Sequence, residues 1–257
     1  MEIALDEDYY VVESEGEGKA KLDYVFDNFA RVKRRHHRTE GKLAFVTPEE
    51  REREAERGDD YTYGLILDIH EVLCLIPDVG SYKRFIDLGS GIGRIVLQVF
   101  LTTEIEDVLG IEVVESRFEK SREHVLRLSE KYRDYKVITN DPSEIQLLYA
   151  GEHGMKTLTI LKKNIFDHSF NFDGDRKSIV NSHVLTKRLP EYRLFMNSFA
   201  RARAFCISMY PLTETESLSD SVAVTVTKSH CHTHTHPIKT DWNTTTGYPF
   251  YLTDFNR

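Results

Sequence analysis

The residues best suited to chemistry follow a short apolar stretch and are interleaved with three closely spaced glycines. Lys83 to Gly89 predicts a buried strand and Ile92 to Leu101 a buried helix, joined by a turn with the spacing G-x-G-x-G. The acid Asp87 lies at the tip of the predicted strand. Glycines at such a turn let the backbone approach a ligand closely. The alternative is a glycine turn of a strand–helix unit that binds nothing.

A second acid, Glu112, ends the next predicted strand, Asp107 to Val113. A carboxylate at that place can accept hydrogen bonds from both ribose hydroxyls of a nucleoside, although an ordinary solvated glutamate is the alternative. The spacing of the turn differs from the G-x-G-x-x-G of dinucleotide-binding folds. An acid at the strand tip also suits a cationic or amine-bearing ligand better than a pyrophosphate. Together these features favour S-adenosylmethionine over NAD.

From about residue 61 the pattern alternates between strands and helices, which predicts an α/β fold with a mostly parallel sheet and helices on both faces. Two strands without a helix between them close the sheet as an antiparallel hairpin. The seven expected strands are 83–89, 107–113, 157–166, 177–184, 204–209, 221–227 and 248–255. The expected helices of this part are 65–76, 92–101, 116–132 and 189–202, and the stretch between Tyr132 and Thr157 is interpreted as a surface excursion.

The first 60 residues are interpreted as an N-terminal helical arm, and residues 61–257 as the main domain. Leu22, Val25, Phe26 and Phe29 have helical spacing, and the Thr47–Glu50 stretch has the pattern of a capping box at a helix start. A basic cluster follows the first helix and comprises Arg31, Lys33, Arg34, Arg35 and Arg38. It is either a solvated helix end or a contact for DNA phosphate or an acidic protein face.

Composition excludes several classes of protein. The chain has 257 residues, a net charge of −8, 40% hydrophobic and 30% charged residues, which excludes a wholly disordered chain. Apolar runs such as Leu73 to Ile76 are too short to span a bilayer, and the acidic N-terminus does not resemble a secretory signal. The three cysteines are widely spaced and odd in number, which argues against a disulfide framework. The acidic balance argues against a generic nucleic-acid binder.

The glycine turn and its continuation, D-L-G-S-G-I-G-R-I-V-L-Q-V from Asp87 to Val99, resemble the signature of the Dot1 family of histone H3 lysine-79 methyltransferases. Weaker matches follow in order along the chain. They are F-V-T-P-E from Phe45, Tyr63-Gly64, Gly110-Ile111-Glu112, Asn164-Ile165-Phe166, Val180-Asn181-Ser182, and the segment from Asp241-Trp242-Asn243 to Tyr251-Leu252. The resemblance covers roughly residues 45–257 and implies a Rossmann-like class I methyltransferase domain.

The resemblance implies a set of site residues. Those expected to bind S-adenosylmethionine are Tyr63, Gly64, Phe85, Asp87, Leu88, Gly89, Ser90, Gly91, Gly93, Arg94, Glu112, Asn164 and Ile165. Those expected at the methyl-transfer point are Asn181, Ser182, Trp242 and Tyr251, with Trp242 capping the sheet edge as the alternative. Four positions depart from the family pattern. Leu65 and Asn164 stand where the family has acids, Ser182 where it has a second asparagine, and His183 where it has an aromatic residue.

The resemblance therefore implies a nuclear enzyme that transfers methyl groups to a histone H3 lysine of the nucleosome, with no membrane attachment. The first alternative is a class I methyltransferase with a small molecule or a non-histone protein as acceptor. The second is a binding module that has lost activity.

Four histidines alternate with other residues from His230 to His236, so in a strand they share one face. Ligands that step along one strand do not converge tetrahedrally on one ion, so a hydrated edge strand is favoured over a metal site. No metal is expected.

Overall fold

A computed structural model describes residues 15–26, 46–57, 69–151, 154–167, 177–182, 191–192, 195–196, 199, 204–208, 232–233 and 251–254. Several predicted features lie outside these residues. They are the basic cluster, Tyr63, Gly64, Leu65, the strand at 221–227 and Trp242.

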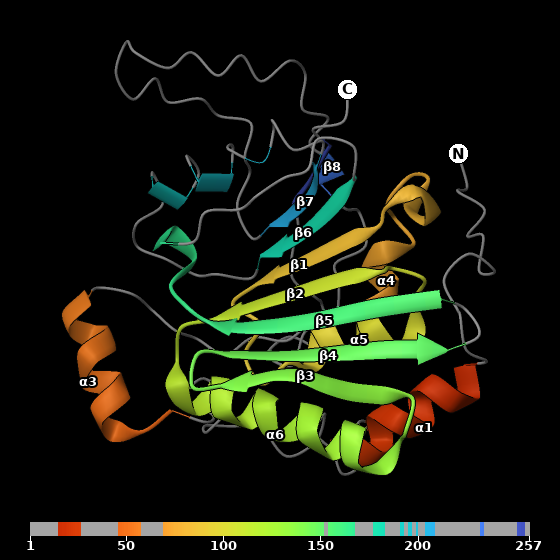
Figure 1. Ribbon diagram of the computed structural model, residues 1–257. Coiled ribbons are helices and arrows are strands. Elements are labelled where there is room, and N and C mark those ends of the chain that lie inside the picture. Colours follow the sequence, from red (N-terminus) through yellow and green to blue (C-terminus); the bar gives the residue numbers. More distant parts are fainter. Residues whose placement is uncertain are drawn as a thin grey trace.

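The described strands form one sheet in the order β3-β4-β5-β2-β1-β6-β7-β9-β8 (Figure 1). The strands are β1 (Arg84–Leu88), β2 (Asp107–Glu112), β3 (Tyr135–Asp141), β4 (Glu144–Gly151), β5 (Gly154–Lys162), β6 (Ser178–Ser182), β7 (Ala204–Ser208), β8 (His232–Thr233) and β9 (Tyr251–Asp254). The five central strands, from β5 to β7, are parallel, β9 pairs antiparallel with β7, and β8 pairs antiparallel with β9. The predicted α/β fold, a mostly parallel sheet closed by an antiparallel hairpin, is confirmed.

The stretch between Tyr132 and Thr157 is not a surface excursion, so that prediction is wrong. It forms β3 and β4, an antiparallel hairpin that extends the sheet beyond β5. The residues of β4 alternate in burial, with Ile145 and Leu147 in the core and Gln146 between them half-buried. This period of two is that of a strand with one face in the core. The nine strands of the described sheet thus comprise six of the seven predicted, the β3–β4 hairpin and the short β8, while the predicted strand 221–227 lies outside the described residues.

The described helices are α1 (Glu15–Val25), α3 (Pro48–Arg57), α4 (His70–Leu73), α5 (Arg94–Thr102) and α6 (Glu115–Lys131), with short 3-10 turns η3 (Val79–Ser81) and η4 (Ile165–Asp167). The predicted capping box at the start of α3 is confirmed. The Thr47 N–H donates to Glu50 Oε2 at 2.8 Å, and the Glu50 N–H donates to Thr47 Oγ1 at 3.2 Å.

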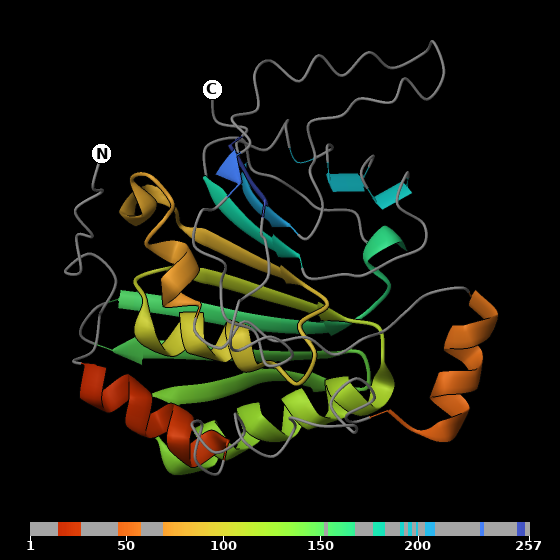
Figure 2. The same ribbon diagram turned by 180° about the vertical axis from the view of Figure 1, so that it is seen from behind.

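Two clusters of buried side chains lie on the two faces of the sheet. The larger joins α1, α4, α5 and α6 to one face and includes Phe85 and Val108. Figure 2 shows α4 and α5 in front of the strands on this side. The smaller cluster lies on the opposite face and includes Ile86, Leu88 and Tyr192. Consecutive residues of β1 therefore alternate between the two cores, as a strand buried on both faces requires.

Helix α1 shares the larger core with α5 and α6. Its residues Leu22 and Val25, and Phe26 directly after it, are buried in that cluster. Lys21 Nζ donates to the Tyr135 hydroxyl at 3.0 Å, which ties α1 to β3. The division of the chain near residue 60 stays a prediction, but α1 itself is packed against the main domain.

None of the helices in the described part of the chain has the length and apolar character needed to cross a bilayer.

Replacing Leu22 by Ala should lower the free energy of unfolding by about 2–4 kcal/mol, because a buried leucine is truncated and leaves a cavity. Lys19→Ala, on the exposed side of the same helix, is the control and should change it by less than about 0.5 kcal/mol. Urea unfolding followed by circular dichroism measures both. Equal stability of the two variants would show that α1 adds nothing to the folded domain.

Candidate functional site

The two acids and the glycine turn meet at the carboxyl ends of the parallel strands. Strands β1 and β6 are neighbours, while the chain passes from β1 to β2 and β5 on one side and returns to β6 on the other. Ligands of open α/β sheets bind outside the carboxyl ends of the strands at such a reversal of strand order. Asp87 and Asn181 lie opposite each other across it, and Asn181 Nδ2 donates to Asp87 Oδ1 at 2.8 Å.

All three glycines of the turn have backbone angles that favour glycine. The φ values are 80° for Gly89, 56° for Gly91 and 79° for Gly93. A side chain at any of these positions would be strained, which explains the G-x-G-x-G spacing. The turn is fixed to β2, since the N–H groups of Gly89 and Ser90 both donate to the Ile111 carbonyl.

The Glu112 carboxylate joins the turn to the start of α6. Its Oε2 accepts the Gly91 N–H at 2.7 Å, and its Oε1 accepts the Val114 N–H at 2.8 Å. The side chain is buried, yet each oxygen keeps a lone pair for a further donor. The Gly91 N–H of the turn is therefore not available to a pyrophosphate.

Asp87 is buried near a second carboxylate, that of Glu112, and is therefore a weaker acid than an exposed aspartate. Burial, which is the largest effect, and the nearby Glu112 carboxylate together raise the pKa of Asp87 to about 7, although the hydrogen bond from Asn181 lowers it. Within the described part of the chain neither acid forms an ion pair. A cation in contact with Asp87 would therefore stabilise the ionised carboxylate.

Two further polar atoms at this place have no hydrogen-bond partner among the described residues: Ser90 Oγ and Asn181 Oδ1. Buried oxygens without partners are uncommon and point to a missing ligand or water. The site thus offers two carboxylates, an amide oxygen and a hydroxyl. This set fits a cationic nucleoside with ribose hydroxyls and would repel an anionic pyrophosphate. The residues present therefore fit S-adenosylmethionine.

Most of the other predicted cofactor residues lie near the carboxyl ends of the parallel strands, but on different faces of the sheet. Phe85 and Leu88 belong to the opposite cores of the sheet. Arg94 is buried in the first turn of α5. Asn164 and Ile165 follow β5, and the Asn164 Oδ1 accepts the Phe166 N–H at 3.0 Å, so an adenine amine would have to use its second lone pair.

The predicted methyl-transfer residues are separated by the strand alternation. Asn181 shares the face of Asp87, whereas Ser182 pairs with Leu88 and accepts a hydrogen bond from the Tyr192 hydroxyl at 2.8 Å. Ser182 of β6 pairs with Ser208 of β7, and Ser208 pairs in turn with Tyr251 of β9. The backbone of Tyr251 therefore lies at the same edge as Asn181. Trp242, Tyr63 and Gly64 lie outside the described residues.

One side chain that supports the turn was missed by the motif analysis. His124 of α6 is buried, and its Nδ1 lies 3.0 Å from the Ile92 carbonyl oxygen inside the turn, while its ring packs on Phe26, directly after α1. Burial lowers the pKa of His124 to about 4, so the ring is neutral and Nδ1 is the donor. Its place on the inner stripe of α6, between Phe118 and Leu128, was the available signal.

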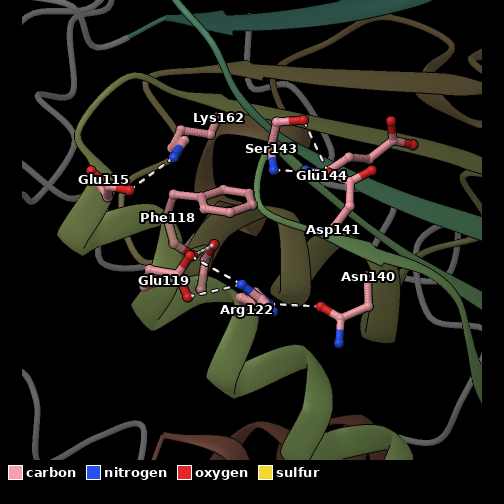
Figure 3. Close-up of polar contacts among 10 residues, drawn as sticks. Glu115, Phe118, Glu119, Arg122, Asn140, Asp141, Ser143, Glu144 and Lys162 are labelled. Carbon is pink, nitrogen blue, oxygen red and sulfur yellow. Dashed lines mark hydrogen bonds and ion pairs between the residues drawn. The ribbon is translucent and has the colours of Figure 1, made fainter.

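A polar network fixes the β3–β4 turn to α6 beside the carboxyl ends of the strands (Figure 3). Arg122 donates to Asn140 Oδ1 at 2.6 Å and to both oxygens of Glu119 at 3.1 Å. The Asp141 carboxylate accepts the N–H groups of Ser143 and Glu144, both at 2.8 Å. The tip of the β3–β4 hairpin, which the sequence analysis did not predict, is thus held by side-chain hydrogen bonds near the carboxyl ends of the parallel strands.

Among the described residues no group of three His, Cys, Asp or Glu side chains could hold a metal ion. Of the alternating histidines only the backbone of His232 is described, in β8 at the edge of the sheet.

Replacing Asp87 by Asn should make stability less dependent on pH. The native protein holds a proton on Asp87 up to about pH 7, whereas the unfolded chain loses it near its ordinary value of 3.8, so wild-type stability falls as pH rises between these values. The stability of the variant relative to wild type should therefore increase by about 2–3 kcal/mol from pH 5 to pH 8. Chemical unfolding at both pH values measures this. A constant difference would show that Asp87 has an ordinary pKa.

One family of known proteins matches this part of the chain. The family described as histone methylation protein DOT1 matches residues 46–191, which is more than half of the chain and includes the glycine turn, Glu112 and Asn181. No curated protein matches the chain significantly.

Several solved structures are similar in part. The methyltransferase domain of bacterial CtHen1-CN is 15% identical, with a TM-score of 0.42, and the match covers 72% of this chain and 95% of that one. A putative S-adenosylmethionine dependent methyltransferase from Listeria monocytogenes is 17% identical over 55% of this chain and 52% of that one, with a TM-score of 0.33. YcgJ from Bacillus subtilis is 12% identical over 51% and 45%, with a TM-score of 0.32.

The chain thus spans about half the length of the Bacillus and Listeria structures. The family match is the finding that decides its relationship, since it includes both strand-end acids and the turn between them. The chain belongs to the DOT1 family of histone methylation proteins.

Proposed function

We propose that the protein is an S-adenosylmethionine-dependent lysine methyltransferase that acts on histone H3 in the nucleosome, at a lysine of the lysine-79 type. One observation supports the proposal most strongly. Asp87 and Glu112 are both buried at adjoining strand ends around a glycine turn, and neither has an ion-pair partner in the described structure. Membership in a histone methylation family supports the choice of a histone as acceptor.

Each residue at the strand ends has a role toward the cofactor in this proposal. Glu112 accepts hydrogen bonds from the ribose hydroxyls with the lone pairs that its two backbone donors leave free. Asp87 offsets the positive charge of the methionine end. Asn164 and Ile165 lie near the adenine. The bound cofactor supplies a methyl group on a sulfonium, which a nucleophile can attack directly.

The protein has little covalent work to do in such a transfer. The lysine amine must be neutral to form the new C–N bond as the C–S bond breaks, and its proton then passes to solvent. Apolar surroundings favour the neutral amine. Asn181 Oδ1, a buried acceptor without a partner in the described structure, would orient an amine hydrogen. Orientation of the two reactants accounts for most of the acceleration in this proposal. Trp242 and Tyr251 are proposed as the walls of the lysine channel.

The basic cluster from Arg31 to Arg38 is proposed as the contact with nucleosomal DNA or an acidic histone surface. A nuclear location follows from this function. The second candidate function is methyl transfer to a small molecule or to another protein, because the described site specifies the cofactor more closely than the acceptor.

Asp87→Ala and Glu112→Ala should each abolish binding of S-adenosylmethionine in isothermal titration calorimetry, since each removes a buried acid that faces the cofactor. Glu115→Ala, which removes an exposed acid at the start of α6, should bind like wild type. Wild-type affinity should fall as pH is lowered through about 7, where Asp87 becomes protonated. Retained affinity in both alanine variants would remove the cofactor assignment.

Incubation with methyl-labelled cofactor should label histone H3 in nucleosomes and label free histones and cell extract less. Replacing Arg31, Lys33, Arg34, Arg35 and Arg38 by Gln should lower the nucleosome signal by about tenfold or more, because each lost phosphate contact weakens binding. Replacing the exposed Arg133 and Lys136 by Gln is the control. Labelling confined to small molecules of the extract would favour the second candidate function.

A further inference from the structure

The start of α6 lacks a cap from its own sequence. Its N-cap residue is Val114, which has no side-chain hydrogen-bond acceptor, so the first N–H groups of the helix need acceptors from elsewhere. This start directly follows β2 and Glu112. The way in which these N–H groups are satisfied therefore affects the position of Glu112.

A distant carboxylate supplies the missing cap. Glu50 Oε1 accepts the Ser116 N–H at 2.9 Å, and Glu50 Oε2 accepts the Ser116 hydroxyl at 2.7 Å. The same Oε2 accepts the Thr47 N–H at 2.8 Å within the capping box of α3. The Glu50 side chain thus caps both α3 and α6, although Glu50 and Ser116 lie 66 positions apart in the sequence.

The charge of Glu50 is suited to this task. Partial burial raises the pKa of Glu50, but the hydrogen bonds from Thr47 and Ser116 outweigh burial and leave it below its ordinary value. The group is therefore ionised at neutral pH, and an ionised acceptor at a helix N-terminus forms stronger hydrogen bonds than a neutral one.

We propose that Glu50 is a positioning residue for the nucleoside-binding acid Glu112. By holding Ser116 it fixes the first turn of α6, and hence the Val114 N–H that orients Glu112 Oε1. The other oxygen of Glu112 is held by Gly91 of the glycine turn. The capping box of α3 is thus coupled to the site through Ser116 and Val114. This inference rests on the proposed function, in which Glu112 binds the ribose of S-adenosylmethionine.

Calorimetric titration with S-adenosylmethionine tests the coupling. Glu50→Ala should weaken binding by about tenfold, the loss expected when a charge-assisted hydrogen bond no longer supports the site. Glu50→Gln should lose less, because its amide oxygen can still accept the Ser116 N–H. Glu49→Ala, an exposed neighbour in the same turn, is the matched control and should bind like wild type.

Ser116→Ala should weaken binding less than Glu50→Ala, because only the hydroxyl bond is lost. The double variant should bind no more weakly than Glu50→Ala alone, because both changes remove the same contact. Affinity of Glu50→Ala within twofold of Glu49→Ala would overturn the proposal. Should Glu50→Ala fail to fold, Glu50→Gln and Ser116→Ala give the same comparison.

Amide hydrogen exchange without cofactor separates this inference from the proposed function. Glu50→Ala should speed the exchange of the Gly91 and Val114 amides, which donate to Glu112, and leave the β3–β4 amides unchanged. Faster exchange at these two amides in a protein whose wild type binds no S-adenosylmethionine would refute the proposed function and keep the coupling. Unchanged exchange would refute the coupling.

Discussion

The arrangement of the site depends on the two backbone N–H groups that hold the Glu112 carboxylate. One comes from Gly91 in the glycine turn and the other from Val114 at the start of α6. Glu112 therefore connects the first strand–helix unit to the second, and any movement of either unit changes its orientation. Two supports outside the site limit that movement: His124 at the Ile92 carbonyl and Glu50 at Ser116.

The site is organised at a cost to stability. Two carboxylates lie buried near each other, and burial leaves Asp87 with a pKa of about 7. Two buried oxygens, of Ser90 and Asn181, have no hydrogen-bond partner in the described structure. Such features destabilise the free protein and become favourable only when a ligand of the right charge binds, which is typical of functional sites. The apolar side chains buried on both faces of the sheet offset this loss of stability.

The sequence predicted the elements whose pattern is local. The strand–turn–helix around Asp87 and the capping box at Thr47 were both found because residue type and spacing determine them directly. The β3–β4 hairpin was missed although β4 has a clear alternation, because its length did not fit the expected fold. The contacts of Glu50 and His124 could not be predicted, since they join segments distant in sequence. Asn181 and Ser182 are consecutive residues of one strand, so their side chains lie on opposite faces of the sheet.

The most direct test of the account is a crystal structure of the protein with S-adenosylhomocysteine, the product that keeps the nucleoside and the amino acid. The account predicts both ribose hydroxyls within hydrogen-bond distance of Glu112, and the amino acid end on the side of Asp87 and Asn181. A nucleoside bound elsewhere, or side chains from the rest of the chain filling the space before these acids, would contradict it.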